Sequence, residues 1–560
     1  MPTIPTGGLE GLANFLDDFM GGIQLISFAI TLGALIWIGY ILPGLNRVTL
    51  PSQPDRSEGA QKLVDYGLGW VYAGAFTLAA GHAISLLAKA WVLKETLGQL
   101  PLAAYLGTTQ FQAGFLRMLF GLSLGIAARN LRHSPHDPIQ WRVVAGLMAA
   151  VILCGAWLTH GVGRFENRAM LMLFTLVHQI AGAIWFGGVV QLIVFWRVAR
   201  SSPQLRTLWP QVLHRFSSLG LIAVATLLFT GLPLAWSYVN SLTALIGTGY
   251  GSLLLTKVIL LGVALGFAWL NYRAGKRWEK GHSDPDLQET TPHIIEAEAF
   301  ILVSLLFVAA TLSSQPPAVD IPNLTVTPAE VWNMFSPKWP QLNSSTHEDL
   351  LIAEAQRAAI VGMDTDALVA SKIWSDFNHN VSGIFVTGMA LIALIGYIWR
   401  IPWTKQYWPL GFIGLGFFLF FRSDAQAWPL GPLGFWESTF SDGEILQHRM
   451  ATVLVFFLGG LEIRARTCAS AKHLRYMFPI LCAFGGILLL THSHAGFELE
   501  TEYLIQSTHT VMGLIAVLIA AARWLELKLK PPAAIWAGIT AMGLMGLVGL
   551  ILMFYDEPLY

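Results

Sequence analysis

The sequence predicts an all-α fold, a polytopic membrane bundle of about fourteen transmembrane helices in two sub-bundles. Of the 560 residues, 54% are hydrophobic and 12% are charged, and the mean hydropathy is +0.56. A soluble protein cannot bury so much apolar surface, so we expect the chain to lie in a lipid bilayer. The net charge of zero gives no sign of a nucleic-acid-binding surface.

Apolar runs near the ~20 residues that cross the hydrocarbon core recur along the chain. A first group lies at 21–45, 66–93, 105–128, 143–161, 171–196, 216–236, 251–272 and 294–314. A second group lies at 381–399, 407–421, 445–463, 476–492, 504–522 and 534–555. The run at 407–421 is short, so its ends are the least defined.

A polar stretch rich in Pro, Ser and Asn separates the two groups, and it contains a short predicted helix near 347–359. We therefore predict three domains. An eight-helix membrane domain covers 1–317, a periplasmic linker covers 318–375, and a six-helix, histidine-rich membrane domain covers 376–560.

Basic residues gather in alternate loops. These loops lie at 129–142, 197–215, 273–280, 464–475 and 523–530. Short loops rich in Lys and Arg stay on the cytoplasmic side of a membrane. We therefore expect both termini and the linker on the outer, periplasmic side.

The histidines of the spans all fall at the outer side of this arrangement, although successive spans run in opposite directions. They are His82, His160, His178, His379, His448, His492, His494 and His509. His82 lies deepest, in the outer half of its span. Neutral imidazoles bind copper, zinc and haem iron alike, so this pattern predicts a metal site without naming the metal.

A single histidine in a span is as readily a packing residue as a ligand. The signal is stronger for His448 and His509 together with His492 or His494, because several imidazoles then meet at one level. His492 and His494 differ in direction on a helix, so one of the two is expected to be the ligand. Arg117, in the middle of a span, requires a partner, which could be a carboxylate, a lipid, a haem propionate or a helix carbonyl.

Four segments of the first group resemble the copper resistance membrane protein family CopD. They are HGVG at 160–163, HQIAGAIWFGG at 178–188, RFSSLGLIAVATLLFTG at 215–231 and YGSLLLTKVILLGVALGFAWLN at 250–271. Glu296 or Glu298 at the start of the last span of this group, and QPP at 315–317, also fit. The resemblance covers roughly 21–317, a little over half of the chain.

This resemblance implies a bacterial inner-membrane protein that handles copper and works with a periplasmic CopC-like copper-binding partner. The family is usually described as moving copper inward across the inner membrane. His160 and His178 match its motifs, and His82 fits its pattern. No catalytic residues come with the resemblance.

The second group of spans resembles the C-terminal extension of long members of the same family, through QHR at 447–449, THSHAG at 491–496 and STHT at 507–510. It resembles four-helix membrane cytochromes b more weakly. Its histidines lie at one face, which permits one outer haem b or a copper site and argues against a ladder of haems across the membrane.

Three functions follow as hypotheses. In the first, outer histidines capture copper and pass it across the membrane, with His82 as a second step. In the second, the protein is a haem b oxidoreductase that reduces copper or exchanges electrons with quinol. Its axial pair would be His448 and His509, or His379 and His492. In the third, the protein only binds or senses copper. Whether the protein is an enzyme stays open, and the absence of a P-loop argues against ATP-driven transport.

Overall fold

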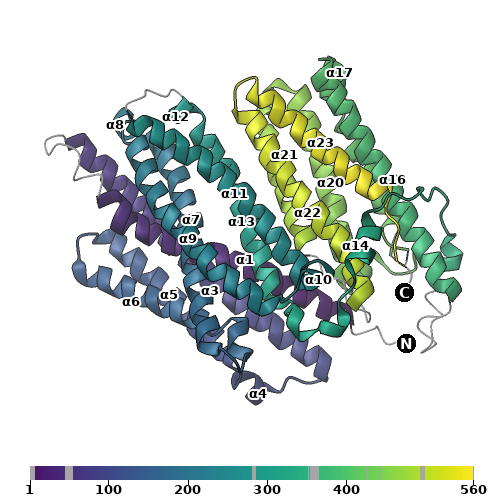
Figure 1. Cartoon of the computed structure of the whole chain (residues 1–560), viewed down its shortest axis with the longest axis horizontal. Helices are drawn as coiled ribbons and strands as arrows, with labels where there is room; N and C mark the ends of the chain where they lie inside the picture. Colours follow the sequence, from purple (N-terminus) through teal and green to yellow (C-terminus); the bar gives the residue numbers. More distant parts are fainter. Residues whose placement is uncertain are drawn as a thin grey trace. The chain divides into compact units, whose positions relative to one another are not determined.

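The computed structural model describes residues 7–43, 54–280, 286–350, 352, 365–425, 427–441, 443–491 and 499–558. Within these ranges every regular element is a helix (Figure 1). This confirms the all-α class. The predicted helix near 347–359 lies largely outside the described residues.

Twelve helices of the described chain are long and apolar enough to cross a membrane. They cover all of the expected spans except 407–421 and 445–463. At 407–421 the structure has α18, Leu410–Arg422, whose 13 residues rise only about 20 Å. At 445–463 it has α20, Gly443–Thr467, which is long enough but carries charged residues near both ends.

The chain divides into two compact units. The N-terminal unit comprises 16–238 and 257–314, and the C-terminal unit comprises 1–15, 239–256 and 315–560. The helices that build the N-terminal unit are most of α1 (Gly7–Ile36), η1 (Trp37–Ile41), α3 (Pro54–Leu97), α4 (Leu102–Leu106), α5 (Thr109–His133), α6 (Pro138–Ala156), η2 (His160–Gly163), α7 (Arg168–Ala199), α8 (Pro203–Arg206), α9 (Trp209–Tyr238), most of α11 (Gly249–Glu279), α12 (Asp286–Glu289) and α13 (Thr291–Ser314).

The N-terminal unit contains two groups of helices that pack against one another. Helix α5 packs between α3 and α6, and α7 packs against α9 and α13. Helix α1 crosses α7 so closely that a Cβ atom on Gly187 would lie 2.1 Å from the carbonyl oxygen of Ala29, and one on Gly33 would lie 2.4 Å from the Cα of Gly187. Backbones of membrane helices approach this closely only where both residues are small.

The C-terminal unit contains short helices and six longer ones. They are α10 (Leu242–Gly247), η3 (Ala318–Asp320), η4 (Pro322–Leu324), α14 (Pro328–Phe335), α16 (Thr365–Ile398), α17 (Pro402–Tyr407), α18, α19 (Phe435–Ser441), α20, η5 (Ala469–Tyr476), α21 (Met477–Leu490), α22 (Leu499–Lys528) and α23 (Ala533–Met553). Helix α16 packs on α23, α22 packs on both α21 and α23, and α20 packs on α18 and α21.

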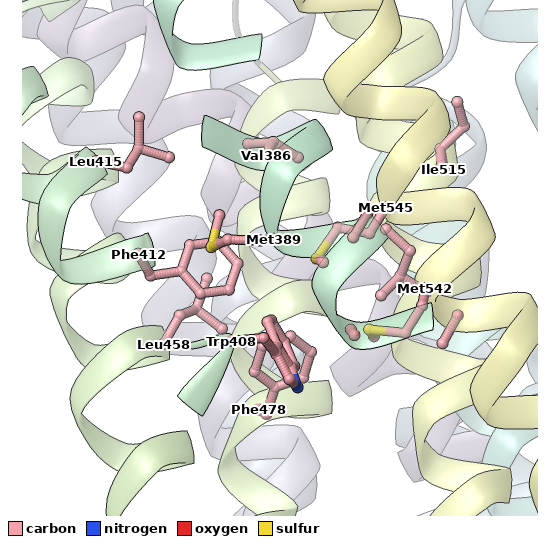
Figure 2. Close-up of a cluster of buried hydrophobic side chains, with 14 residues drawn as sticks. Val386, Met389, Trp408, Phe412, Leu415, Leu458, Phe478, Ile515, Met542 and Met545 are labelled. Carbon is pink, nitrogen blue, oxygen red and sulfur yellow. The ribbon is translucent and has the colours of Figure 1, made fainter. Parts of the chain in front are cut away.

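An aromatic cluster holds the core of the C-terminal unit together (Figure 2). The rings of Trp408, Phe412 and Phe478 have mutual centroid distances of 5.7 to 6.1 Å, and Met389 and Met545 fill the space around them. Aromatic rings at such distances attract each other beyond the gain from burial alone. The cluster fixes α16 and α18, which carry or adjoin residues of the candidate site.

Candidate functional site

His160 lies in η2, between α6 and α7 of the N-terminal unit. Its Nε2 is 3.3 Å from the carbonyl oxygen of Leu312, and its ring centroid is 5.9 Å from that of Tyr238 at the end of α9. A carbonyl can only accept, so Nε2 carries the hydrogen, and in the neutral ring Nδ1 keeps the lone pair. Metal-binding histidines are oriented in this way by an acceptor on the opposite nitrogen.

His178, in the middle of α7, is held by the neighbouring helix α9. Its Nδ1 is 2.9 Å from the hydroxyl oxygen of Thr230. That hydroxyl already donates to the carbonyl of Thr226 at 2.7 Å, so it accepts from His178. The neutral His178 ring therefore has its lone pair on Nε2. Lys257 is a charged neighbour that interacts electrostatically with this ring.

The two histidines lie at different levels of the N-terminal unit. His160 is beside Tyr238, and His178 is bonded to Thr230, two turns earlier on the same helix. Eight residues of an α-helix rise about 12 Å. The two histidines thus contact α9 at two positions, two turns apart.

His82 is not part of this pair. It lies on α3, is buried, and its Nε2 has no hydrogen-bond partner. Arg117 and Lys89 are the charged groups that interact with it electrostatically. The positive charge of Arg117 repels a metal cation at His82, whereas the charge of Lys89 is paired with Asp17 at 3.2 Å.

Arg117 has none of the charged partners expected for it within the described residues; the polar group that its charge interacts with is the thiol of Cys154. An unpaired charge at the centre of a span costs ~2.5–3.5 kcal/mol on insertion scales. The ring of Phe28, with its centroid 5.1 Å from the guanidinium carbon, compensates part of that cost.

Three of the segments that resemble CopD meet at one buried carboxyl group. Glu298 accepts hydrogen bonds from Trp185 Nε1 at 2.9 Å and from Asn271 Nδ2 at 3.1 Å. All three side chains are buried and come from α13, α7 and α11. The cluster joins these helices. It also decides between the two glutamates, because Glu296 instead contacts His293 at 3.1 Å.

In the C-terminal unit, His379 lies beside two other rings. Its centroid is 4.3 Å from that of Tyr555 and 6.1 Å from that of His509. Its Nδ1 is 2.9 Å from the carbonyl oxygen of Ser375, and the Nδ1 of His509 is 3.1 Å from that of Ile505. Both carbonyls accept, so each neutral ring has its lone pair on Nε2.

His448, on α20, is held by a carboxylate. Its Nδ1 is 2.8 Å from Oδ1 of Asp424, which follows the end of α18. Burial alone would raise the pKa of Asp424, but the charge and hydrogen bond of His448 outweigh it and hold the pKa below its usual value. His448 also interacts electrostatically with His379, so the three rings belong to one neighbourhood. A carboxylate behind an imidazole makes it a better metal ligand.

The remaining predicted ligands of this unit, His492 and His494, lie outside the described residues. Among the side chains that the structure does describe, no group of three or more His, Cys, Asp or Glu is close enough to hold a metal ion. His379, His448 and His509 therefore lie near one another without forming a closed set of ligands. Neither of the predicted haem pairings can be identified from these positions. The pairing of His379 with His492 includes a residue outside the described part, and the ring contact in the structure joins His379 to His509.

Sequence reasoning did not identify Thr230, Asp424 or Tyr555. Asp424 lies in a loop on the predicted outer side, near the predicted position of the outer histidines. It could have been proposed as a histidine partner from the sequence, because metal-bound imidazoles commonly donate a hydrogen bond to a carboxylate. Thr230 lies within one of the quoted segments but looks like an ordinary small residue of a span. Tyr555 gives no sequence signal, since its contact depends on how α23 packs against α16.

Comparison with known proteins agrees with the resemblance in the sequence. Residues 210–312, which include α9, α11 and most of α13, match the family model of copper resistance protein D. Copper transport protein CutJ of Bacillus subtilis (strain 168) is 26% identical over 201 residues, which are 36% of this chain and 35% of that protein. The match thus spans about a third of the relative's length, and no solved structure matches. Residues 210–312 are therefore similar to copper resistance protein D, and the long apolar helices of the described chain make it a multi-pass membrane protein.

Proposed function

We propose that the N-terminal unit moves copper across a bacterial inner membrane by way of His160 and then His178. The observation that carries this proposal is that two oriented imidazoles contact residues of α9 about 12 Å apart along the helix, and that α9 lies in the part of the chain that matches the family. A path through a membrane needs successive sites, each weak enough to release its ion.

This route replaces the second step that the sequence suggested. His82 has two cationic neighbours, whereas His178 has one and also has a hydrogen-bond acceptor that orients it. We therefore assign copper to His160 and His178, with His160 at the periplasmic end. A CopC-like copper-binding protein that delivers copper to His160 is part of the proposal, as is a periplasmic location of both termini.

The test is copper uptake into proteoliposomes that contain the full chain and a fluorescent copper chelator inside. Uptake is measured with and without ascorbate, so that both oxidation states are supplied. We expect His178→Ala to lower the initial rate at least tenfold. His160→Ala should lower the initial rate at low copper concentration, because the entry site concentrates the ion. At high copper concentration the rate of this variant should return to that of the wild type. His133→Ala changes an exposed histidine of the same unit and serves as the control. Wild-type rates in both variants would refute the route.

We further propose that copper binds at the outer side of the C-terminal unit, with His379, His448 and His509 as separate candidates for its ligands. Each ring has one nitrogen engaged by a protein acceptor, as metal ligands do. An absorption spectrum and a metal analysis of the purified protein test this. Bound copper that falls in His379→Ala supports the proposal. A Soret band that falls in the same variant would make the ligand haem b and the unit an electron-transfer module.

A further inference from the structure

Arg117 is a buried guanidinium, and two of its three nitrogens have no hydrogen-bond acceptor among the described residues. The side chain is 5% exposed, and Nε and Nη2 have no hydrogen-bond partner. Lys89, a neighbouring cation in the same unit, differs from it, because its Nζ lies 3.2 Å from a carboxylate oxygen of Asp17. Buried donors in folded proteins are nearly always matched by an acceptor, which can be an ion that the protein binds.

His82 lies at the level of Arg117. A Cβ atom on Gly114 would lie 3.4 Å from Leu86, and one on Gly121 would lie 3.4 Å from Ala79. Helices α3 and α5 therefore run antiparallel in a register that places Arg117 opposite His82. The imidazole is 3% exposed, and its Nε2 has no partner. Two buried groups with unpaired polar nitrogens thus lie at the same level of neighbouring helices.

Two neighbouring residues lie close to the guanidinium. The ring of Phe28 covers one part of it, with its centroid 5.1 Å from Cζ. On α6 a glycine stands next to it, and a Cβ atom on Gly155 would lie only 3.1 Å from Cζ and from Nη2. A larger residue at Gly155 would press on the guanidinium and displace it.

We propose that Arg117 and His82 bind a monovalent inorganic anion such as chloride inside the N-terminal unit. An anion accepts charge-assisted hydrogen bonds from both groups and also neutralises the guanidinium, which a neutral carbonyl or water cannot do. The phosphate of a lipid shares this chemistry, but both side chains are almost fully buried, which favours a small ion. The site repels copper and is independent of the route through His160 and His178.

The test measures thermal unfolding of the detergent-purified full chain in sodium chloride and in sodium gluconate at equal ionic strength. A ligand that binds only the folded state raises the unfolding temperature in proportion to the logarithm of its concentration. We expect chloride and bromide to raise it by about 2 °C or more over gluconate. Arg117→Lys, which keeps the charge, should retain part of the shift, and Arg117→Gln should lose it. Gly155→Ala should reduce the shift without changing any charge.

Arg168→Gln is the matched control, since Arg168 also lies over an aromatic ring but is exposed. If Arg117→Gln does not fold, His82→Leu removes the second donor and should lower chloride affinity at least tenfold. Native mass spectrometry distinguishes the two sources. A phospholipid adduct that is present in the wild type and lost in His82→Leu would identify a lipid phosphate as the anion. Equal unfolding temperatures in chloride and gluconate, with no such adduct, would overturn the proposal.

Discussion

The rings of His379 and His509 lie with their centroids 6.1 Å apart, although they belong to α16 and α22. A metal–imidazole bond is about 2 Å long, so two imidazoles on opposite sides of one ion have centroids about 6 Å apart. The observed distance therefore leaves room for a single ion between the rings. Of the histidine relationships in the C-terminal unit, this one bears most directly on metal binding.

We expect His379→Ala and His509→Ala each to remove the same bound ion. The double variant should then lose no more metal than either single variant, because both rings serve one site. Metal content of the purified protein by mass spectrometry measures this. His473→Ala, in η5, is the control. Losses that add in the double variant would mean two independent sites.

Asp424→Asn should weaken metal binding at His448. The amide keeps the shape of the carboxyl group but removes the charge that orients the imidazole, and such changes commonly cost 10–100-fold in metal affinity. Competition with a copper chelator of known affinity measures the effect. Glu437→Gln alters an exposed carboxylate of the same region and should have no effect. An affinity within twofold of the wild type would show that His448 is not a ligand.

The contact between Asp424 and His448 should also have a defined pH dependence. The pKa of Asp424 is held below its usual value of 3.8 in the folded protein. A carboxyl group of this kind stabilises the fold above its unfolded pKa, and the stabilisation is lost as the pH falls through the folded pKa. Wild type should therefore unfold at a higher temperature than Asp424→Asn from about pH 5 upward, and the difference should shrink progressively as the pH falls below 3.8. A difference that grew on acidification would contradict this assignment.

The fold should tolerate the substitution Glu298→Gln but not Glu298→Leu. In Glu298→Gln the new NH2 group meets Asn271, whose Oδ1 has no partner and can accept from it after the Asn271 amide turns over. In Glu298→Leu the donors of Trp185 and Asn271 are left buried and unpaired, which costs about 2–4 kcal/mol. Thermal unfolding of both variants in detergent measures this difference. Equal losses in the two variants would mean that packing, and not hydrogen bonding, sets the cost.

The crossing of α1 and α7 should be intolerant of a single methyl group. Gly187→Ala places a Cβ atom 2.1 Å from the carbonyl oxygen of Ala29, so the helices must separate. Overpacking of this kind costs about 1–3 kcal/mol. Gly146→Ala, where nothing lies within 4 Å of the new atom, should be neutral or slightly stabilising. Thermal unfolding of the two variants compares them, and equal stability would show that the crossing can relax.

The fold class could be predicted from the sequence because hydrophobic length is a strong local signal. Most span positions agree with the structure for the same reason. The runs at 407–421 and 445–463 were harder, because the first folds as the 13-residue α18 and the second carries charges near its ends. The choice of Glu298 over Glu296 required tertiary structure, because both begin the same span and only packing shows which one faces α7 and α11.

The histidines of the candidate site could be proposed from the sequence, but the groups that hydrogen-bond to them could not. The alternating directions of the predicted spans are enough to place five histidines at the outer side: His160, His178, His379, His448 and His509. The acceptors that orient these rings are carbonyls, a hydroxyl group and Asp424, which come from distant parts of the sequence or from the backbone. The unfavourable surroundings of His82 likewise depend on Arg117 and Lys89, which the fold brings near.

The residues that follow α23 are part of the histidine site. Tyr555 lies against His379, Asn380 donates hydrogen bonds to the carbonyls of Leu552 and Tyr555, and Asp556 forms ion pairs with Lys338 and Lys372. Membrane proteins are synthesised from the N-terminus onward, and early segments can fold before late ones exist. This site therefore cannot be completed until residue 556 has left the ribosome. Copper offered to a nascent chain would meet the route through the N-terminal unit first, and the histidines of α16 would acquire their final surroundings last.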